Sequence, residues 1–276
     1  MGLLHDGIIR VKQLVKTLAL LCMSLWLIAM SPGSGAAPTI PYKIITERTH
    51  KPTLFTQGLQ IENDQFYESS GLYGKSLLVS YPVEEPEGST WARLSAPFTH
   101  KQPLPERFFA EGLTLLDDKL YLLTWKEGTL LVYDKTTLHY QKSLGYTGEG
   151  WGLTTDGEYL IRSDGSDTLF FHAPQDFRLE KTMKVQDQGK AITRINELEY
   201  HAGFIWANIW HEDRIIRIDP NTGDATGELV LSALRNTMKL NNPEQVLNGI
   251  AWDEKRNGFW ITGKLWPKMF LIQPGD

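Results

Sequence analysis

The 276-residue chain contains a single cysteine, Cys22, which lies in an apolar stretch near the N-terminus. A lone cysteine cannot form an intrachain disulfide, so the fold must be stabilised by its hydrophobic core. Positive charge is also scarce, because 28 Lys and Arg residues stand against 33 Asp and Glu residues, a formal net charge of -5. This balance gives no electrostatic support for binding nucleic acid, and we expect no such partner.

Several motifs with known chemistry are missing as well. The chain has no Walker loop, no H-E-x-x-H pair and no G-x-S-x-G nucleophile elbow. Its seven histidines do not fall at the spacings of a metal site. These absences argue against a P-loop nucleotidase, a zinc protease and a serine hydrolase, and they predict no metal site.

The N-terminal segment has the pattern of a secretory signal peptide. Basic residues precede an apolar run at 18–30, and the small residues "SPGSGAAP" follow it. We predict a signal peptide over residues 1–36, cleaved after Ala36, and an exported protein, periplasmic or secreted, that leaves the membrane after cleavage. The alternative is an uncleaved membrane anchor, since the apolar run is near the lower length limit for spanning.

A repeat runs through the rest of the chain. Five stretches open with a small or acidic residue followed by Leu or Ile, and the openings recur 40 to 54 residues apart. These positions are Leu59, Leu113, Leu153, Leu198 and Ile250. Each opening is followed by a turn, an aromatic-rich strand, a second turn and a third strand such as "SLLVSY" or "RIIRID". A repeat of about 40–50 residues is typical of the four-stranded blade of a β-propeller.

The sequence therefore predicts an all-β fold, a five-bladed β-propeller with four-stranded blades, as one domain over residues 37–276. Outer strands are expected in "WARLSAPF", "HYQKSLGY", "FRLEKTMKV" and "ATGELVLS". The fifth unit has none, so we expect the N-terminal strand "YKIITERTH" (42–50) to close the last blade and cover its sheet edge. Residues 231–245 are expected to form a loop with one helical turn. A β-sandwich with similar hairpins is the alternative fold.

In a propeller the first strand of each blade lines the central channel, so the starts of these strands meet at one end of the ring. Those starts carry Gln57, Glu111, Trp151, Asn196, Glu197 and Asn248. The ends of the second strands and the turns after them add Trp125, Asp164, Trp210 and Lys264. The pattern predicts a bowl in which amides, carboxylates, a lysine and indoles face one another.

The same residues carry a resemblance to a known family. The motifs are "FTQGL", "FAEGLT", "LTW", "GWGLTTDG", "INELE", "ANIW", "LNGIAWD" and "GKLWP". Over residues 42–273 they resemble the glutaminyl-peptide cyclotransferases of the plant and bacterial type. The resemblance implies a five-bladed propeller that converts the N-terminal Gln of peptides or proteins to pyroglutamate and releases ammonia. It also implies an acyltransferase that needs no catalytic metal or other cofactor.

Four residues are candidates for the chemistry. The substrate's α-amine must attack its own γ-carboxamide, and ammonia leaves poorly unless it is protonated. Glu111 is the candidate proton carrier, and the resemblance implies the same role because the family's catalytic glutamate lies in an "F-x-E-G-L" setting. Gln57, Asn196 and Lys264 are candidates for polarising the amide and holding the oxyanion. The structural alternatives are a solvated turn carboxylate, amides that satisfy backbone groups and a solvated hairpin lysine.

The remaining candidates surround the substrate. Five aromatic residues are expected to form the pocket walls, unless they merely pack the blades: Phe55, Phe109, Trp125, Trp151 and Trp210. Glu197 is expected to orient Lys264 or Asn196 from behind. Three further tryptophans are expected to pack between blades: Trp206, Trp252 and Trp260. Trp266 is left undecided. Asp164, in "SDGSD", is expected to belong to a turn rather than a calcium loop.

Two other functions remain open from the residues alone. One is a metal-dependent propeller lactonase in which Glu111, Asn196 and Asn208 bind the cation. The other is a non-catalytic propeller that binds peptides in its aromatic bowl. The expected partners are peptides or proteins with N-terminal Gln, and the chain is expected to be a monomer.

Overall fold

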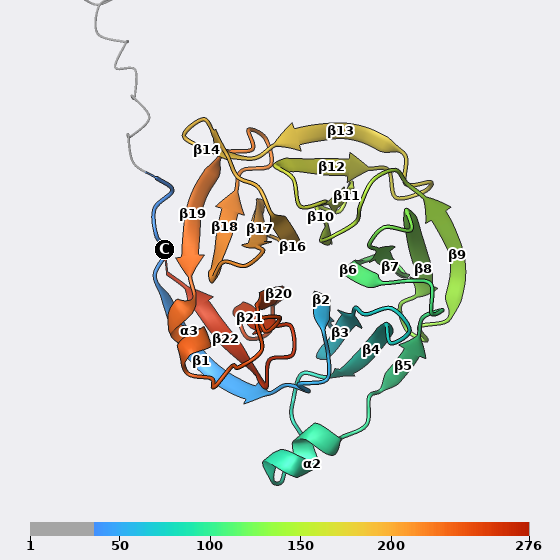
Figure 1. Cartoon of the computed structure of the whole chain (residues 1–276), viewed down its shortest axis with the longest axis vertical. Coiled ribbons are helices and arrows are strands. Elements are labelled where there is room, and N and C mark those ends of the chain that lie inside the picture. Colours follow the sequence, from blue (N-terminus) through green and yellow to red (C-terminus); the bar gives the residue numbers. More distant parts are fainter. Residues whose placement is uncertain (1–35, 276) are drawn as a thin grey trace, which may run out of the picture. The chain divides into compact units, whose positions relative to one another are not determined.

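A computed structural model describes residues 36–275 of the chain. These residues form five four-stranded antiparallel sheets that surround a central axis as blades (Figure 1). Blade 1 contains β2 (Thr56–Glu62), β3 (Gln65–Ser70), β4 (Leu77–Pro82) and β5 (His100–Pro103). Blade 2 contains β6 (Ala110–Leu116), β7 (Lys119–Thr124), β8 (Thr129–Asp134) and β9 (Tyr140–Gly145). Blade 3 contains β10 (Leu153–Thr155), β11 (Leu160–Arg162), β12 (Thr168–His172) and β13 (Leu179–Lys184).

The last two blades complete the ring. Blade 4 contains β16 (Ile195–His201), β17 (Phe204–Ile209), β18 (Arg214–Ile218) and β19 (Ala225–Val230). Blade 5 contains β20 (Leu247–Asp253), β21 (Gly258–Gly263), β22 (Lys268–Pro274) and β1 (Tyr42–Thr49). Outside the blades lie α2 (Thr90–Ser95), α3 (Ser232–Asn236) and the short hairpin of β14 (Gln186–Asp187) and β15 (Lys190–Ala191). The predicted five-bladed propeller is therefore confirmed.

The inner strands contact one another in a closed cycle. Going round the axis, β2 contacts β6, then β10, β16 and β20 follow, and β20 contacts β2 again. The ring closes through the N-terminal strand, because β1 pairs antiparallel with β22 from Tyr42 opposite Pro274 to Thr49 opposite Lys268. The outer edge of the last sheet is thus covered, as the sequence predicts.

One outer strand is not where the sequence predicts it. The segment "WARLSAPF" at 91–98 was expected to be the outer strand of blade 1, but α2 occupies its first part and β5 follows at His100–Pro103. Ser89 caps the helix, since its hydroxyl accepts a hydrogen bond from the backbone N–H of Ala92. The helix buries none of its residues, so local capping rather than packing defines it. The other three outer strands and the helical turn at α3 are where they were predicted.

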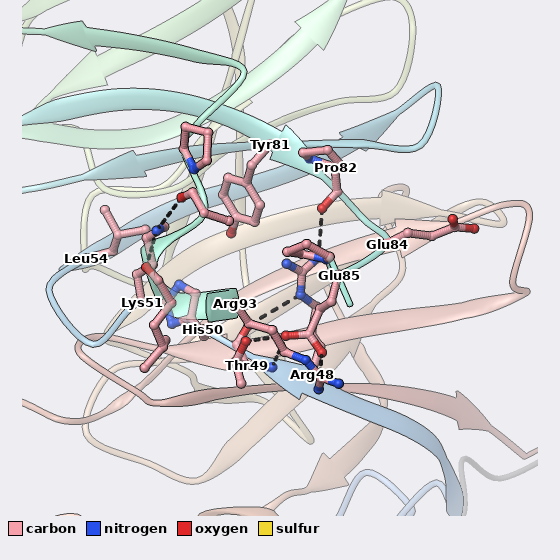
Figure 2. A pocket seen from close by; sticks show the side chains of 14 residues that line it. Arg48, Thr49, His50, Lys51, Leu54, Tyr81, Pro82, Glu84, Glu85 and Arg93 are labelled. Atoms are coloured by element: carbon pink, nitrogen blue, oxygen red, sulfur yellow. Dashed lines mark hydrogen bonds and ion pairs between the residues drawn. The ribbon is translucent and has the colours of Figure 1, made fainter. Parts of the chain in front are cut away.

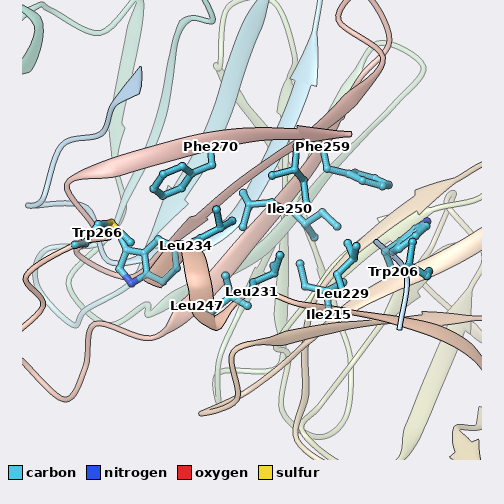
Figure 3. Close-up of a cluster of buried hydrophobic side chains, with 14 residues drawn as sticks. Trp206, Ile215, Leu229, Leu231, Leu234, Leu247, Ile250, Phe259, Trp266 and Phe270 are labelled. Atoms are coloured by element: carbon cyan, nitrogen blue, oxygen red, sulfur yellow. The ribbon is translucent and has the colours of Figure 1, made fainter. Parts of the chain in front are cut away.

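Apolar side chains fill the spaces between neighbouring blades. The cluster between blades 4 and 5 brings together Trp206, Phe259 and Trp266, with Leu234 of α3 inserted among them (Figure 3). Trp266, left undecided by the sequence, is fully buried there. Trp252 packs against the same cluster and stacks on His201. Burial of aromatic area on this scale is the main stabilising contribution available to a chain without disulfides.

The predicted signal peptide lies outside the described residues and remains a prediction. Within residues 36–275, no helix has the length and apolar character needed to cross a membrane.

The closing role of β1 can be tested by truncation. A chain that begins at His50 loses every β1–β22 pair, whereas a control chain that begins at Ala36 keeps them. Each lost hydrogen bond costs about 1 kcal/mol, so we expect the shorter chain to melt roughly 10 °C lower or more. Thermal unfolding followed by circular dichroism measures the difference, and equal melting temperatures would contradict the closure.

Candidate active site

The inner strands share a distortion at the end where the candidate residues gather. In blades 1, 2, 4 and 5 the pairing register between the inner strand and its neighbour shifts at its start. The residues skipped by the pairing include Gln57, Glu111, Asn196 and Asn248. A bulge of this kind re-aims a side chain out of the regular alternation. It explains how polar residues can sit at positions that a regular strand would pair.

The second residue of each inner-strand opening lies where neighbouring blades approach one another most closely. Blades 1, 2, 3 and 5 have glycine there, as in "QGL", "EGL", "WGL" and "NGI". At Gly152 an added Cβ would lie 2.0 Å from the backbone oxygen of Asn196 in the next blade. The N–H of Gly112 donates to the carbonyl of Trp151 at 2.6 Å, also across blades. Glycine at these positions lets the inner strands meet at the axis.

Blade 4 has Glu197 in place of that glycine, and its side chain crosses the channel. The fully buried carboxylate accepts hydrogen bonds from the backbone N–H groups of Leu59 at 3.2 Å and Ile250 at 3.0 Å. Glu197 was expected in the substrate-binding set, orienting Lys264 or Asn196. That role stays a prediction: the side chain joins blades 4, 1 and 5 through these bonds and is not among the residues that line the pocket.

Glu199 repeats this cross-channel arrangement further along β16. Its carboxylate accepts from the backbone N–H of Trp252 at 2.9 Å and from the side chain of Gln60. Burial raises the pKa of Glu199 to about 8, and burial also raises the pKa of Glu197 well above its usual range. The channel below the pocket is thus built around two buried acids.

The pocket at the bulged end encloses about 290 Å³. Every other candidate site residue lines it: Phe55, Gln57, Phe109, Glu111, Trp125, Trp151, Asn196, Trp210 and Lys264. They come from all five blades, so the ring brings together residues more than 200 positions apart in the sequence. This volume is close to the lower end of the range for small-molecule sites in proteins.

Glu111 is buried in the pocket wall, with 5% of its surface exposed. The side-chain amide of Gln57 donates to its Oε1 at 3.0 Å. Burial raises the pKa of Glu111 well above the usual range of a carboxyl group. The charge of Lys264 opposes that rise, whereas Glu149 and Glu127 add to it. This pKa shift brings the carboxyl group toward the range in which it can both accept and donate a proton near neutral pH.

Lys264 is buried in the lining of the same pocket, and its Nζ lies 4.9 Å from the centre of the Phe55 ring. Burial lowers the pKa of Lys264, while the nearby carboxylates of Glu111 and Glu244 counteract that effect. The backbone holds its turn in place, since Lys264 N donates to Val246 O and Leu265 N donates to Leu54 O. Lys264 is therefore a buried amine with little water around it, on a turn whose backbone is held in place.

The amides complete the polar lining. The Oδ1 atom of Asn196 is buried and has no hydrogen-bond partner among the described residues. Asn248 donates to the Oε1 of Gln57 at 3.3 Å, which fixes the amide that donates to Glu111. An unpartnered buried acceptor costs free energy unless a ligand or water supplies a donor. The Oδ1 atom of Asn248 is unpartnered as well, but of these two residues only Asn196 lines the pocket.

The aromatic residues contact one another edge to face around the pocket. Phe109 lies 6.3 Å from Phe55 and 5.5 Å from Trp125, measured between ring centres. Trp151 lies 5.5 Å from Trp210 in a T-shaped arrangement. The predicted wall of rings is therefore present, and its members contact one another as well as the cavity.

Three residues near the pocket were missed by the sequence analysis. Leu72 and Glu244 line the cavity from the loop after β3 and from the loop of residues 231–245. Glu149 lies just behind the wall and accepts hydrogen bonds from the indoles of Trp125 and Trp151. Loop residues carry no periodic signal, although the position of Glu149 in "GEGWG" beside a candidate wall residue was a usable clue.

A second cavity, of about 330 Å³, lies between β1, the segment after β4 and α2 (Figure 2). Its charged groups bind the protein itself. Arg48 donates to the carbonyls of Pro82 and Val83, while Glu85 accepts from Thr49 and Arg93. These groups are used to hold α2 and β1, so this cavity offers less chemistry than the pocket around Glu111.

Within the described residues, no three His, Cys, Asp or Glu side chains are grouped so that they could hold a metal ion. Asp164 caps its own turn, because its carboxylate accepts from the backbone N–H and the hydroxyl of Ser166. The expectation that "SDGSD" is a turn is confirmed.

Comparisons with known proteins agree with this geometry. The model of the glutamine cyclotransferase family matches residues 17–273. A glutaminyl-peptide cyclotransferase of Arabidopsis thaliana is 37% identical over 235 residues, which is 84% of this chain and 70% of the relative. A glutaminyl cyclase of Myxococcus xanthus, solved by crystallography, superposes with a TM-score of 0.78 at 36% identity. That match covers 87% of this chain and all of the other.

The raised pKa of Glu199 has a measurable consequence for stability. Below its unfolded pKa of about 4.3 the group is protonated in both states, and its contribution to stability is lost as the pH rises through about 8. The variant Glu199→Gln removes this dependence of stability on pH, because an amide does not titrate. Gln60 can rotate its own amide and so keep a hydrogen bond to residue 199. We expect the free energy of unfolding of the variant, relative to the original chain, to rise by up to about 1.4 kcal/mol per pH unit between pH 5 and 8.

Denaturant titrations at pH 5, 6.5 and 8 measure that difference. A difference that stays constant across these values would mean that Glu199 titrates normally despite its burial.

Proposed function

The chain belongs to the glutamine cyclotransferase family, and from this premise we propose that Glu111 moves the protons as an N-terminal glutaminyl residue closes to pyroglutamate. The substrates are peptides or proteins with N-terminal Gln. The observation that carries the proposal is the convergence of Glu111, Lys264 and the unpartnered Asn196 oxygen on one small pocket. The reaction is an intramolecular aminolysis that forms a lactam and releases ammonia.

Binding comes first. The glutaminyl side chain enters between the indoles of Trp125, Trp151 and Trp210, while the rest of the peptide stays outside. The walls select the curled conformer, in which the α-amine lies next to the γ-carbonyl carbon. Because both reacting groups belong to one residue, holding this conformer supplies much of the acceleration. The substrate N–H groups also give the Oδ1 of Asn196 the donor that it lacks.

The attack follows. The neutral α-amine forms a bond to the γ-carbon, and its proton passes to the carboxylate of Glu111. The carbonyl oxygen gains negative charge, which the buried ammonium group of Lys264 stabilises. A preorganised donor of this kind is worth about 3 kcal/mol. Gln57 holds the carboxylate of Glu111 at 3.0 Å so that it faces the reacting atoms.

Collapse of the intermediate completes the cycle. Glu111 returns its proton to the leaving nitrogen, the bond between that nitrogen and the γ-carbon breaks, and ammonia departs. The carboxylate is regenerated, so no outside proton donor is needed. A carboxyl group whose pKa is raised toward that of an α-amine, about 8, suits both halves of this transfer.

The lactonase alternative has less support. It requires Asn208 as a cation ligand, but the Oδ1 of Asn208 accepts a hydrogen bond from the backbone N–H of Gly249 and the residue does not line the pocket. A peptide-binding propeller would use the same pocket without chemistry. Peptide binding alone does not explain why both Glu111 and Lys264 are buried, because burying charged groups costs free energy.

The variant Glu111→Gln tests the proton carrier. Gln keeps the size of the side chain but cannot exchange a proton, so we expect turnover of a Gln-initiated dipeptide to fall roughly 10²–10⁴-fold. Ammonia release measures the rate, and Glu87→Gln, an exposed substitution outside the pocket, is the matched control. Equal turnover by Glu111→Gln and the original enzyme would remove Glu111 from this role.

The pH profile provides an independent test. The reaction requires the carboxylate form of Glu111 and the neutral amine of the substrate, and lowering the pH protonates both. Because the pKa of Glu111 is raised, kcat/KM should already decline on the acidic side of neutrality. A profile that stays flat down to pH 5 would contradict the neutral-amine step.

A further inference from the structure

One carboxylate oxygen joins two walls of the pocket. Glu149 lies in the segment between β9 and β10, and its Oε2 accepts a hydrogen bond from the indole N–H of Trp125 at 2.7 Å. The same atom accepts from the indole N–H of Trp151 at 3.0 Å. Trp125 follows the second strand of blade 2 and Trp151 precedes the first strand of blade 3. The bridge therefore spans the junction between two blades.

These two hydrogen bonds restrict the orientation of the Trp125 and Trp151 rings. An indole has one donor, and the torsion that turns its ring about the Cβ–Cγ bond is broad unless that donor is engaged. Hydrogen bonds to an ionised acceptor are shorter and about twice as strong as neutral ones. A single oxygen that accepts from both indoles thus couples their orientations, so that neither ring can turn without losing the shared acceptor.

The bridge completes a chain of contacts around the pocket. Trp125 packs against Phe109, and Trp151 packs against Trp210. Glu149 connects these two edge-to-face pairs. Resting on the proposed cyclotransferase reaction, we propose that Glu149 is a positioning residue that fixes both indoles in the orientation that clamps the glutaminyl side chain.

The backbone around Glu149 is held by other groups. The guanidinium of Arg162 donates to the backbone carbonyl of Glu149, and Gly150 N donates to Trp125 O at 2.8 Å. The N–H of Trp151 donates to Ser163 O at 3.0 Å. The side chain of Glu149 is 41% exposed. Removing it should leave the segment in place, so a variant reports on the indoles rather than on folding.

A substitution of Glu149 also changes its electrostatic interactions with nearby charged groups. The Nζ of Lys126 lies 4.0 Å from Glu149 Oε1 and 3.8 Å from the centre of a Trp125 ring. The charge of Glu149 also adds to the raised pKa of Glu111. Loss of charge and loss of the acceptor are therefore separate effects, and two substitutions are needed to distinguish them.

The first experiment observes the indoles directly. In protein labelled with ¹⁵N-tryptophan, the Nε1–H signals of Trp125 and Trp151 are assigned with Trp125→Phe and Trp151→Phe. We expect Glu149→Ala to shift both signals upfield together, because both donors lose the same acceptor. The buried indoles of Trp206 and Trp260 serve as internal references. If neither signal moves, or only one does, the shared bridge is refuted.

The second experiment measures the consequence for catalysis. We expect Glu149→Ala to raise KM and lower kcat/KM about tenfold, with the melting temperature nearly unchanged because the side chain is partly exposed. Glu149→Gln keeps an oxygen with two lone pairs, so it should restore most of the KM while shifting the acidic limb of the pH profile to lower pH.

An unchanged KM in Glu149→Ala, or a Gln variant no better than Ala, would overturn the positioning role. The two proposals fail separately. If the original enzyme releases no ammonia from a Gln-initiated dipeptide, the proposed reaction is wrong. The indole signals still decide whether Glu149 orients Trp125 and Trp151.

Discussion

The close approach of five inner strands around one axis is the constraint on which the site depends. Glycine allows that approach in blades 1, 2, 3 and 5, and the carboxylate of Glu197 fills the remaining space by binding backbone N–H groups of Leu59 and Ile250. The bulges that accompany the approach turn the preceding side chains toward the pocket. The packing of the ring and the placement of Gln57, Glu111 and Asn196 thus have one physical origin.

Burial in the pocket changes the pKa values of the residues that this geometry brings together. The pocket holds an acid and a base that both lose hydration, so the pKa of Glu111 rises while the pKa of Lys264 falls. Each group supports the charged form of the other, and neither reaches bulk water freely. In the proposed reaction, these shifts lower the cost of moving a proton between Glu111 and a substrate nitrogen. The aromatic walls, with Glu149 behind them, supply the dry surroundings on which these pKa shifts depend.

Much of this arrangement could be predicted from the repeat and its motifs. The recurring openings "QGL", "EGL", "WGL", "NEL" and "NGI" located the inner strands, and with them Gln57, Glu111, Trp151 and Asn196 at one end of the ring. Other features left no periodic signal. The helix α2 replaced an expected strand because Ser89 caps it locally, and Glu244 reaches the pocket from an irregular loop. The aligned openings show Glu197 in the place of a glycine, but they do not show that its carboxylate binds backbone N–H groups of two other blades.

Burial raises the pKa of Glu111 well above its ordinary value, and the protonated carboxyl group can be observed directly. Infrared difference spectra between the original enzyme and Glu111→Gln, recorded over a pH titration, isolate the carbonyl band of protonated Glu111. We expect this band to persist well above the ordinary glutamate pKa of about 4.3. Loss of the band at or below that ordinary value would show that Glu111 is a solvated carboxylate and would contradict the account.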